Sequence, residues 1–202
     1  MRISPATLLL CVAFLPLPSV AGTIEGQVHR VGPAFPAGKD YVISVEDVAE
    51  RPVRVTATID QKNLNFVPHV LAVQRGTTVQ FPNSDPLKHN VFSISPAKRF
   101  NLGMYSQGES RSVTFDQVGI VELLCNVHLE MSAFIVVVAN RYFAQAGSDG
   151  RFRIAGVPAG HHRLRCWQEN IAPQYLDVEV PAEGTVQVEF TIPAGAREAG
   201  GE

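Results

Sequence analysis

Four side chains with metal-binding chemistry lie in two short segments of the chain. Cys125, His128 and Met131 follow one another at the spacing Cys-x2-His-x2-Met, and His89 lies upstream in a separate segment. Thiolate and thioether sulfur favour Cu(I), and imidazole is a good ligand for copper in general. Two histidines and one cysteine with a weakly bound axial methionine form the ligand set of a blue-copper electron-transfer centre. The residue types and their spacing therefore predict a single copper site.

Each of these residues also has a structural interpretation. A single cysteine or methionine in a β protein is more often a soft hydrophobe of the core than a ligand. A structural zinc site fits the set less well, because methionine is a poor zinc ligand. A disulfide between Cys125 and Cys166 would be ordinary in an exported protein, but it would consume the thiolate. We therefore expect Cys166, beside Trp167 in an alternating run, to be a buried free thiol.

The segments around these residues have the pattern of short strands. Val79 and Phe81 alternate with polar residues before Pro82-Asn83, and an apolar run leads directly into Cys125. Such period-2 alternation, interrupted by Gly, Pro and Asn turns, is typical of an all-β sandwich. Residues 95–108, with a proline and two glycines, predict an irregular excursion or a short helical turn. No segment predicts a helix of ordinary length.

The middle of the chain resembles the cupredoxin family, which includes plastocyanin, amicyanin and azurin. The resemblance rests on Val79-Gln-Phe-Pro-Asn83-Ser-Asp85, His89-Asn90, Val118-Gly119, Cys125-x2-His128-x2-Met131 and Phe134-Ile-Val-Val137. The short Cys-x2-His-x2-Met spacing is most similar to that of amicyanin. The resemblance implies a Greek-key β-sandwich over residues 60–139.

It also implies a role for each matching residue. His89, Cys125 and His128 would be the equatorial copper ligands, and Met131 would be the axial ligand. Asn90 matches an asparagine that links the two ligand loops by hydrogen bonds, which fix ligand orientation. The chain departs from many relatives at Leu129, where they have proline, and we expect this change to loosen the loop without removing a ligand.

The flanks resemble a different module. Asp149-Gly-Arg-Phe-x-Ile-x-Gly-Val-Pro-Ala-Gly160 and Leu164-x-Cys-Trp167 are similar to a transthyretin-like or carboxypeptidase-regulatory-like β-sandwich. Residues 22–45 resemble the opening strands of the same module. We therefore expect residues 22–59 and 140–193 to form one discontinuous sandwich that receives the cupredoxin as an insertion, followed by a disordered tail at 194–202.

The ends and the charge of the chain indicate its compartment. Residues 1–21 have the basic start, apolar run and small-residue end of a secretory signal, which would remove Cys11. No later apolar stretch is long enough to span a membrane. The 202 residues carry a net charge of −2, which argues against a nucleic-acid-binding protein. We expect a secreted protein, most simply one of the bacterial periplasm.

These observations favour a one-electron carrier that meets redox partner proteins transiently, and not an enzyme. A multicopper oxidase would need eight histidines for its trinuclear cluster, and the chain has six. A binuclear copper site would need two cysteines in the ligand loop, and this loop has one. Two alternatives stay open: copper storage or delivery, and a glycan- or envelope-binding sandwich that carries a copper domain. The sequence leaves the oligomeric state, the reduction potential and the partners undefined.

Overall fold

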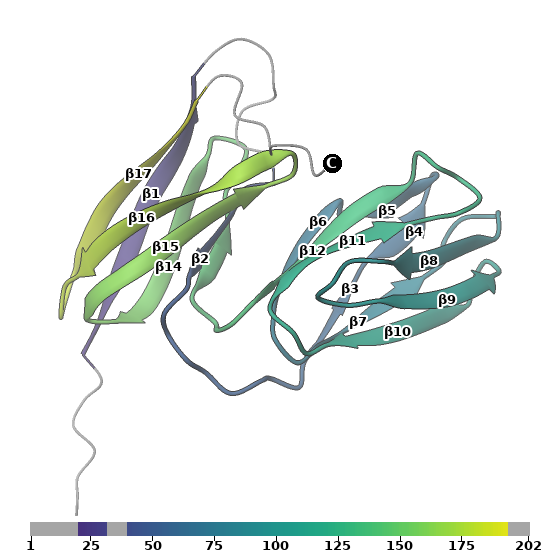
Figure 1. The fold of residues 1–202 in the computed structure, drawn as a ribbon, viewed down its shortest axis with the longest axis horizontal. Coiled ribbons are helices and arrows are strands. Elements are labelled where there is room, and N and C mark those ends of the chain that lie inside the picture. The colour runs from purple at the N-terminus through teal and green to yellow at the C-terminus, as the bar shows by residue number, and fades with distance from the viewer. Residues whose placement is uncertain (1–19, 32–39, 194–202) are drawn as a thin grey trace, which may run out of the picture.

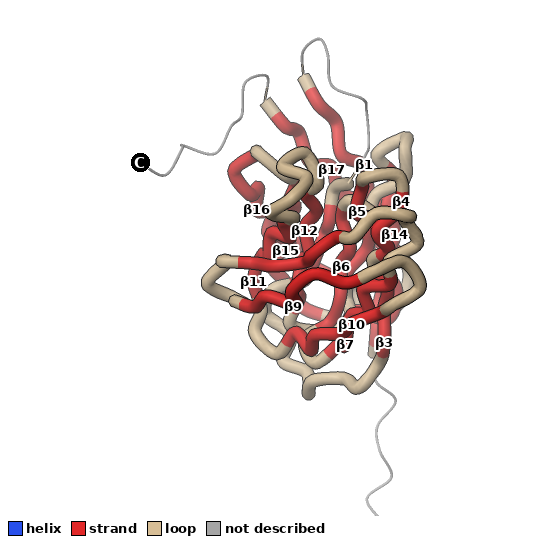
Figure 2. The backbone as a smooth tube through the Cα atoms, turned by 90° about the vertical axis from the view of Figure 1, so that its right-hand side faces the viewer, coloured by secondary structure: helices blue, strands red, loops and turns tan. Residues whose placement is uncertain are grey.

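The computed structural model describes residues 20–31 and 40–193, and these residues form an all-β protein (Figures 1 and 2). Strands and loops account for the whole of this part of the chain, so no helix that could span a membrane occurs within it. Figure 1 shows two β-sandwiches side by side, joined by two chain crossings. The expected all-β class is confirmed.

The flanking sandwich consists of the strands from both ends of the described chain. Its three-stranded sheet contains, in spatial order, β14 (Arg151–Pro158), β1 (Ala21–Arg30) and β17 (Thr185–Ile192). Its four-stranded sheet contains β13 (Phe143–Gln145), β2 (Val42–Val45), β15 (Gly160–Gln168) and β16 (Ile171–Val180). β1 runs antiparallel to β14 and parallel to β17, so the first strand needs partners from the end of the chain.

The central sandwich consists of the strands between residues 56 and 138. Its five-stranded sheet contains β6 (Val70–Gln74), β12 (Ser132–Val138), β11 (Gly119–Leu124), β8 (His89–Ser93) and β9 (Phe100–Tyr105). Its three-stranded sheet contains β10 (Ser110–Phe115), β7 (Thr77–Pro82) and β3 (Thr56–Thr58). A two-stranded ribbon is formed by β4 (Asp60–Lys62) and β5 (Asn65–Val67).

Each sandwich has its own apolar core, built from alternate residues of its strands. A third cluster, which we call the interface cluster, joins the two sandwiches. Its buried members are Val42 and Trp167 from the flanking sandwich and Val70, Val136 and Val138 from the central one. The five-stranded sheet therefore has a second apolar face, which the flanking sandwich covers.

The two chain crossings between the sandwiches are bonded to each other. Asn140 is fully buried, and its side-chain amide donates to the carbonyl oxygens of Val45 and Val48, each at 2.8 Å. Arg141 pairs with the Glu50 carboxylate through its backbone N–H at 2.9 Å and its side chain at 2.7 Å. The outgoing and returning segments are thus fixed at one point.

Two details differ from the sequence expectation. β3 pairs in parallel with β7, so the central sandwich starts at Thr56, before the expected boundary at residue 60. The predicted irregular or helical segment at 95–108 contains the edge strand β9, which pairs with β8. The prediction missed this strand because Pro96, Gly103 and Gly108 interrupt the segment, although Phe100 and Leu102 alternate with Asn101 and Gly103 and pack against the central core. The proposed signal at 1–21 lies outside the described residues up to residue 19, and the tail at 194–202 lies entirely outside them.

Candidate metal centre

Three metal-binding side chains meet at one end of the central sandwich. His89 is the first residue of β8, and Cys125 follows the last residue of the neighbouring antiparallel strand β11. In an antiparallel pair the start of one strand lies beside the end of the other, which brings these two residues together. His128 comes from the loop that follows Cys125. The ligand atoms of the three side chains all lie within 4.8 Å of one another.

The ring nitrogens identify the side of each histidine that faces the cluster. Nδ1 of His89 lies 2.9 Å from Nδ1 of His128, and the latter lies 4.0 Å from Sγ of Cys125. His89 and Cys125 are buried, whereas His128 is only partly so. Two nitrogens and one sulfur converging on one point are suited to a trigonal His₂Cys copper site.

Met131 closes the ligand loop. Its side chain is 1 % exposed within the core of the central sandwich, and its backbone N–H donates to the His128 carbonyl at 3.0 Å. The next residue starts β12, so the loop from Cys125 to Met131 is fixed by a strand at each end. The loop thus holds all of the predicted ligands except His89.

A carboxylate holds the far side of the His89 ring. Oδ2 of Asp85 lies 2.9 Å from Nε2 of His89, and both side chains are buried. The two Asp85 oxygens also accept the backbone N–H groups of Asn63 and Leu64 at 2.7 and 2.8 Å. Since Nε2 is occupied, Nδ1 is the nitrogen left for a metal, an arrangement common among histidine ligands.

These contacts also keep Asp85 ionised. Burial raises the pKa of this carboxyl, but the hydrogen bonds from Leu64, Asn63 and His89 outweigh it. The net result is a pKa below the ordinary aspartate value. The centre therefore contains a buried negative charge directly behind one ligand. Asp85 has no predicted role in the sequence, although an acidic residue four positions before a predicted ligand is a signal for such a contact.

Two asparagines fix the loops that carry the ligands. Oδ1 of Asn90 accepts the backbone N–H of Asn126 at 3.0 Å, which connects the start of β8 to the loop containing Cys125. The Asn83 amide donates to the carbonyl oxygens of Leu87 and Tyr105, at 2.8 and 3.1 Å, and its oxygen accepts the Asp85 N–H. The Asn83 side chain therefore fixes the conformation of the loop that leads to His89.

Exposed apolar side chains stand next to the ligands in the chain. Val127 and Leu129 flank His128 and are 49 % and 84 % exposed, and Leu87, two residues before His89, is 48 % exposed. The position where many relatives carry proline thus presents a leucine to solvent. An apolar surface around a partly exposed ligand is suited to brief contact with another protein.

The remaining candidates take no part in the centre. His161 lies on the surface, whereas His162 is mostly covered and pairs with Asp47 and the Pro158 carbonyl at 3.0 and 2.8 Å. Cys166 is a buried free thiol in the flanking core, and burial raises its pKa to about 12.

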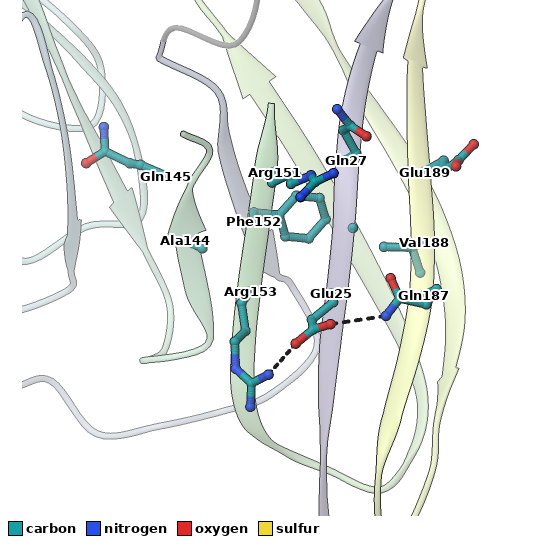
Figure 3. Close-up of a pocket in the computed structure, with 11 residues that line it drawn as sticks. Glu25, Gln27, Ala144, Gln145, Arg151, Phe152, Arg153, Gln187, Val188 and Glu189 are labelled. Carbon is teal, nitrogen blue, oxygen red and sulfur yellow. Dashed lines mark hydrogen bonds and ion pairs between the residues drawn. The ribbon is translucent and has the colours of Figure 1, made fainter. Parts of the chain in front are cut away.

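The flanking sandwich carries a separate polar hollow of about 630 Å³ (Figure 3). Two rows of side chains cross its three-stranded sheet, since Glu25 lies opposite Arg153 and Gln187 while Gln27 lies opposite Arg151 and Glu189. Ion pairing joins Glu25 to Arg153, and Gln187 donates to Glu25 at 3.1 Å. No cysteine lines the hollow, and its lining differs chemically from the metal centre.

Two family models match parts of the chain. Residues 53–138 match the copper-binding proteins of the plastocyanin/azurin family, and residues 118–188 match domain II of polysaccharide lyase family 4. The second match runs from β11 into β17, so it covers strands of both sandwiches. No curated protein sequence gave a match.

Several solved structures are similar to part of the chain. A purple cupredoxin from Nitrosopumilus maritimus is 25 % identical, with a TM-score of 0.37, covering 40 % of this chain and 98 % of its own. An amicyanin variant in the Cu(I) state is 22 % identical, with a TM-score of 0.39 over 41 % of this chain and 81 % of its own. A copper-containing nitrite reductase from Thermus scotoductus is 27 % identical, with a TM-score of 0.40, covering 56 % of this chain but only 28 % of the reductase.

The region that matches the plastocyanin/azurin family is also the region that contains the cluster of metal-binding side chains. Residues 53–138 contain all four predicted ligands, and the structure brings His89, Cys125 and His128 together inside this region. The soft and nitrogen donors present fit copper better than zinc or a hard cation. The central sandwich is therefore similar to a cupredoxin domain, and its donor set fits copper.

Proposed function

We propose that the protein is a periplasmic one-electron carrier with a single type 1 copper centre. The observation that carries the proposal is the convergence of two imidazole Nδ1 atoms and the Cys125 sulfur within 4.8 Å. When bound, copper would supply a Cu(II)/Cu(I) couple. His89, Cys125 and His128 would hold it, and Met131 would supply a further, weaker sulfur donor.

The protein side chains keep this centre in one geometry. Asp85 fixes the His89 ring, Asn90 connects the two ligand loops, and the buried cluster excludes water from the Cys125 side. A site that moves little needs little rearrangement when the electron arrives or leaves. The partly exposed His128, flanked by Val127 and Leu129, gives the shortest route to a partner, and small transient interfaces suit such encounters. The protein in this role is a carrier, not an enzyme.

The first test is spectroscopic. Cu(II) added to the copper-free protein should give an intense blue thiolate-to-copper band and a reversible one-electron couple. Cys125→Ser should abolish the band, while Cys166→Ser should keep it as a matched control. A colourless Cu(II)-loaded wild type would overturn the proposal.

Copper storage or delivery uses the same ligands but predicts a different result. A carrier keeps its metal through repeated oxidation and reduction, whereas a delivery protein releases Cu(I). Retention of copper through several cycles against a competing Cu(I) chelator supports the carrier. Loss of the metal at the first reduction, or the absence of a reversible couple, would favour storage or delivery.

A second candidate function belongs to the flanking sandwich. The polar hollow and the match to a polysaccharide lyase domain favour polysaccharide binding, because paired Arg, Glu and Gln side chains can bond to hydroxyl and carboxylate groups. The copper-free protein would be titrated with alginate and dextran in a calorimeter. Arg153→Ala should weaken binding and the exposed Arg54→Ala should not; heat absent with both polymers would rule this function out.

A further inference from the structure

The strand that leaves the ligand loop is buried on both faces. β12 starts at Ser132, directly after Met131, and its residues Ala133, Ile135 and Val137 face the central core. The alternate residues Val136 and Val138 belong to the interface cluster, with Phe134 packed against it. The position of β12 therefore depends on the flanking sandwich as well as on its own.

A histidine outside the copper ligands bonds to the start of this strand. Nδ1 of His69 donates to the Ser132 carbonyl at 3.0 Å, and the His69 carbonyl accepts the Phe134 N–H at 2.8 Å. The other ring nitrogen, Nε2, lies 2.7 Å from Oε2 of Glu169, which follows β15 in the flanking sandwich. One ring thus connects the residue after Met131 to a carboxylate of the second sandwich.

Aromatic contacts also connect the start of β12 to the flanking sandwich. The rings of Trp167 and Phe134 lie 5.6 Å apart, and the Phe134 ring lies 5.8 Å from the edge-on ring of His69. Trp167 and Glu169 are two residues apart, so the end of β15 supplies both the ring contact to Phe134 and the carboxylate contact to His69. Close-packed interiors transmit small displacements, because such contacts cannot be stretched without loss.

We propose that Glu169 is a positioning residue for the copper ligand loop. It acts through His69 on Ser132, and so on the placement of Met131, whose N–H is bonded to His128. The proposal rests on the proposed function and goes beyond it, since it assigns the flanking sandwich a part in setting the copper geometry. The Glu169–His69 pair is partly exposed and adds little to stability, as partly exposed ion pairs generally do. Its effect should instead appear at the metal centre.

The test compares Glu169→Ala with Glu169→Gln and with Glu179→Ala. Glutamine can still bond to the His69 ring, whereas alanine cannot. Glu179 is a matched control, because it pairs with the exposed His161 on the same sandwich. In copper-loaded protein, Glu169→Ala should shift the equilibrium with a redox mediator about threefold or more. We expect a smaller effect than the roughly 10–100-fold loss of metal affinity or activity that follows removal of a group bonded directly to a metal ligand. Glu169→Gln and Glu179→Ala should stay near wild type.

A second measurement uses the copper-free protein. Glu169→Ala should move the backbone amide NMR signals of His128, Met131 and Ser132, and Glu179→Ala should not. Signal changes confined to residues near 169, with an unchanged mediator equilibrium, would overturn the inference. If wild type were colourless with Cu(II), the proposed function would fail, and the NMR result would still decide whether Glu169 positions the loop.

Discussion

Oδ2 of Asp85 lies 2.9 Å from Nε2 of His89, with the carboxylate also bonded to two backbone N–H groups of the turn between β4 and β5. This single contact connects the ribbon, the loop after β7 and the first copper ligand. It also places a negative charge behind the imidazole of His89, whose Nδ1 faces His128 in the proposed copper site. The first prediction follows from that charge.

Asp85→Asn should weaken copper binding and raise the reduction potential. Removal of the anion destabilises Cu(II) more than Cu(I), and the asparagine NH2 group cannot accept the hydrogen bonds that the second carboxylate oxygen accepts. Loss of such a partner costs about 10–100-fold in metal affinity. Competition with a calibrated chelator and a spectroelectrochemical titration measure the two effects. Asp116→Asn, which removes an exposed carboxylate paired with Lys98, is the control and should change neither; a lowered potential in Asp85→Asn would contradict the prediction.

Met131→Leu should keep copper bound and raise the potential. The thioether is a weak donor that stabilises Cu(II), and leucine has no donor atom. The two side chains have similar volume, so the core should tolerate the change at a cost below about 1.5 kcal/mol in the free energy of unfolding. A tenfold shift in the redox equilibrium corresponds to about 59 mV for one electron, and we expect a rise of about that size. Voltammetry beside a thermal unfolding curve would measure both, and a lower potential would count against an axial role.

Leu129→Asp should slow electron self-exchange without altering the copper spectrum. Leu129 is next to His128 and largely exposed, so a charge there would make two copies repel at the contact surface. We expect at least about a tenfold decrease in rate, within the range of electrostatic effects on association. Line broadening in mixtures of oxidised and reduced protein gives the rate. Val118→Asp adds the same charge before β11, at the opposite end of that strand from Cys125, and equal slowing by both variants would exclude His128 as the exit.

Cys166 should resist alkylation in the folded protein at pH 8. Thiolate is the reactive form, and burial raises the pKa of this thiol from about 9 to about 12. At pH 8 that shift lowers the thiolate fraction about a thousandfold, and the rate should rise as the pH approaches 12 for as long as the fold persists. Iodoacetamide labelling followed by peptide mass spectrometry reports the residue directly. Fast labelling of the native protein would contradict the buried position, while unfolding in guanidinium should restore the reaction.

The sequence indicated most of the copper centre because its chemistry is local. Cys125, His128 and Met131 share one loop, and the structure brings His89 to Cys125 and His128 through an antiparallel pair of strands. The all-β class was visible in the alternation of apolar residues. The transthyretin-like identity of the flanking sandwich stays a prediction, and so does the bacterial periplasm.

Contacts between distant segments were not predictable in the same way. Asp85 and His69 look like ordinary loop residues, and only the fold places one behind His89 and the other between Ser132 and Glu169. The strand β9 was missed because Pro96, Gly103 and Gly108 gave its segment the composition of an irregular loop, although Phe100 and Leu102 alternate and pack against the central core. The burial of β12 on both faces was not predictable either, because a run of Val and Ile is equally typical of any buried strand.

The pairing of β1 with β17 favours an order of folding as the chain emerges in its final compartment. The central sandwich has all its strands once residue 138 has emerged, whereas β1 must wait for a parallel partner from the far end of the chain. Contacts so distant in sequence form slowly, because a long loop must close before they gain any stability. The copper ligands would thus be assembled while β1 and β2 are still unpaired. The interface cluster, and the contact of Glu169 with His69, would form last, as the flanking strands close around a centre that already exists.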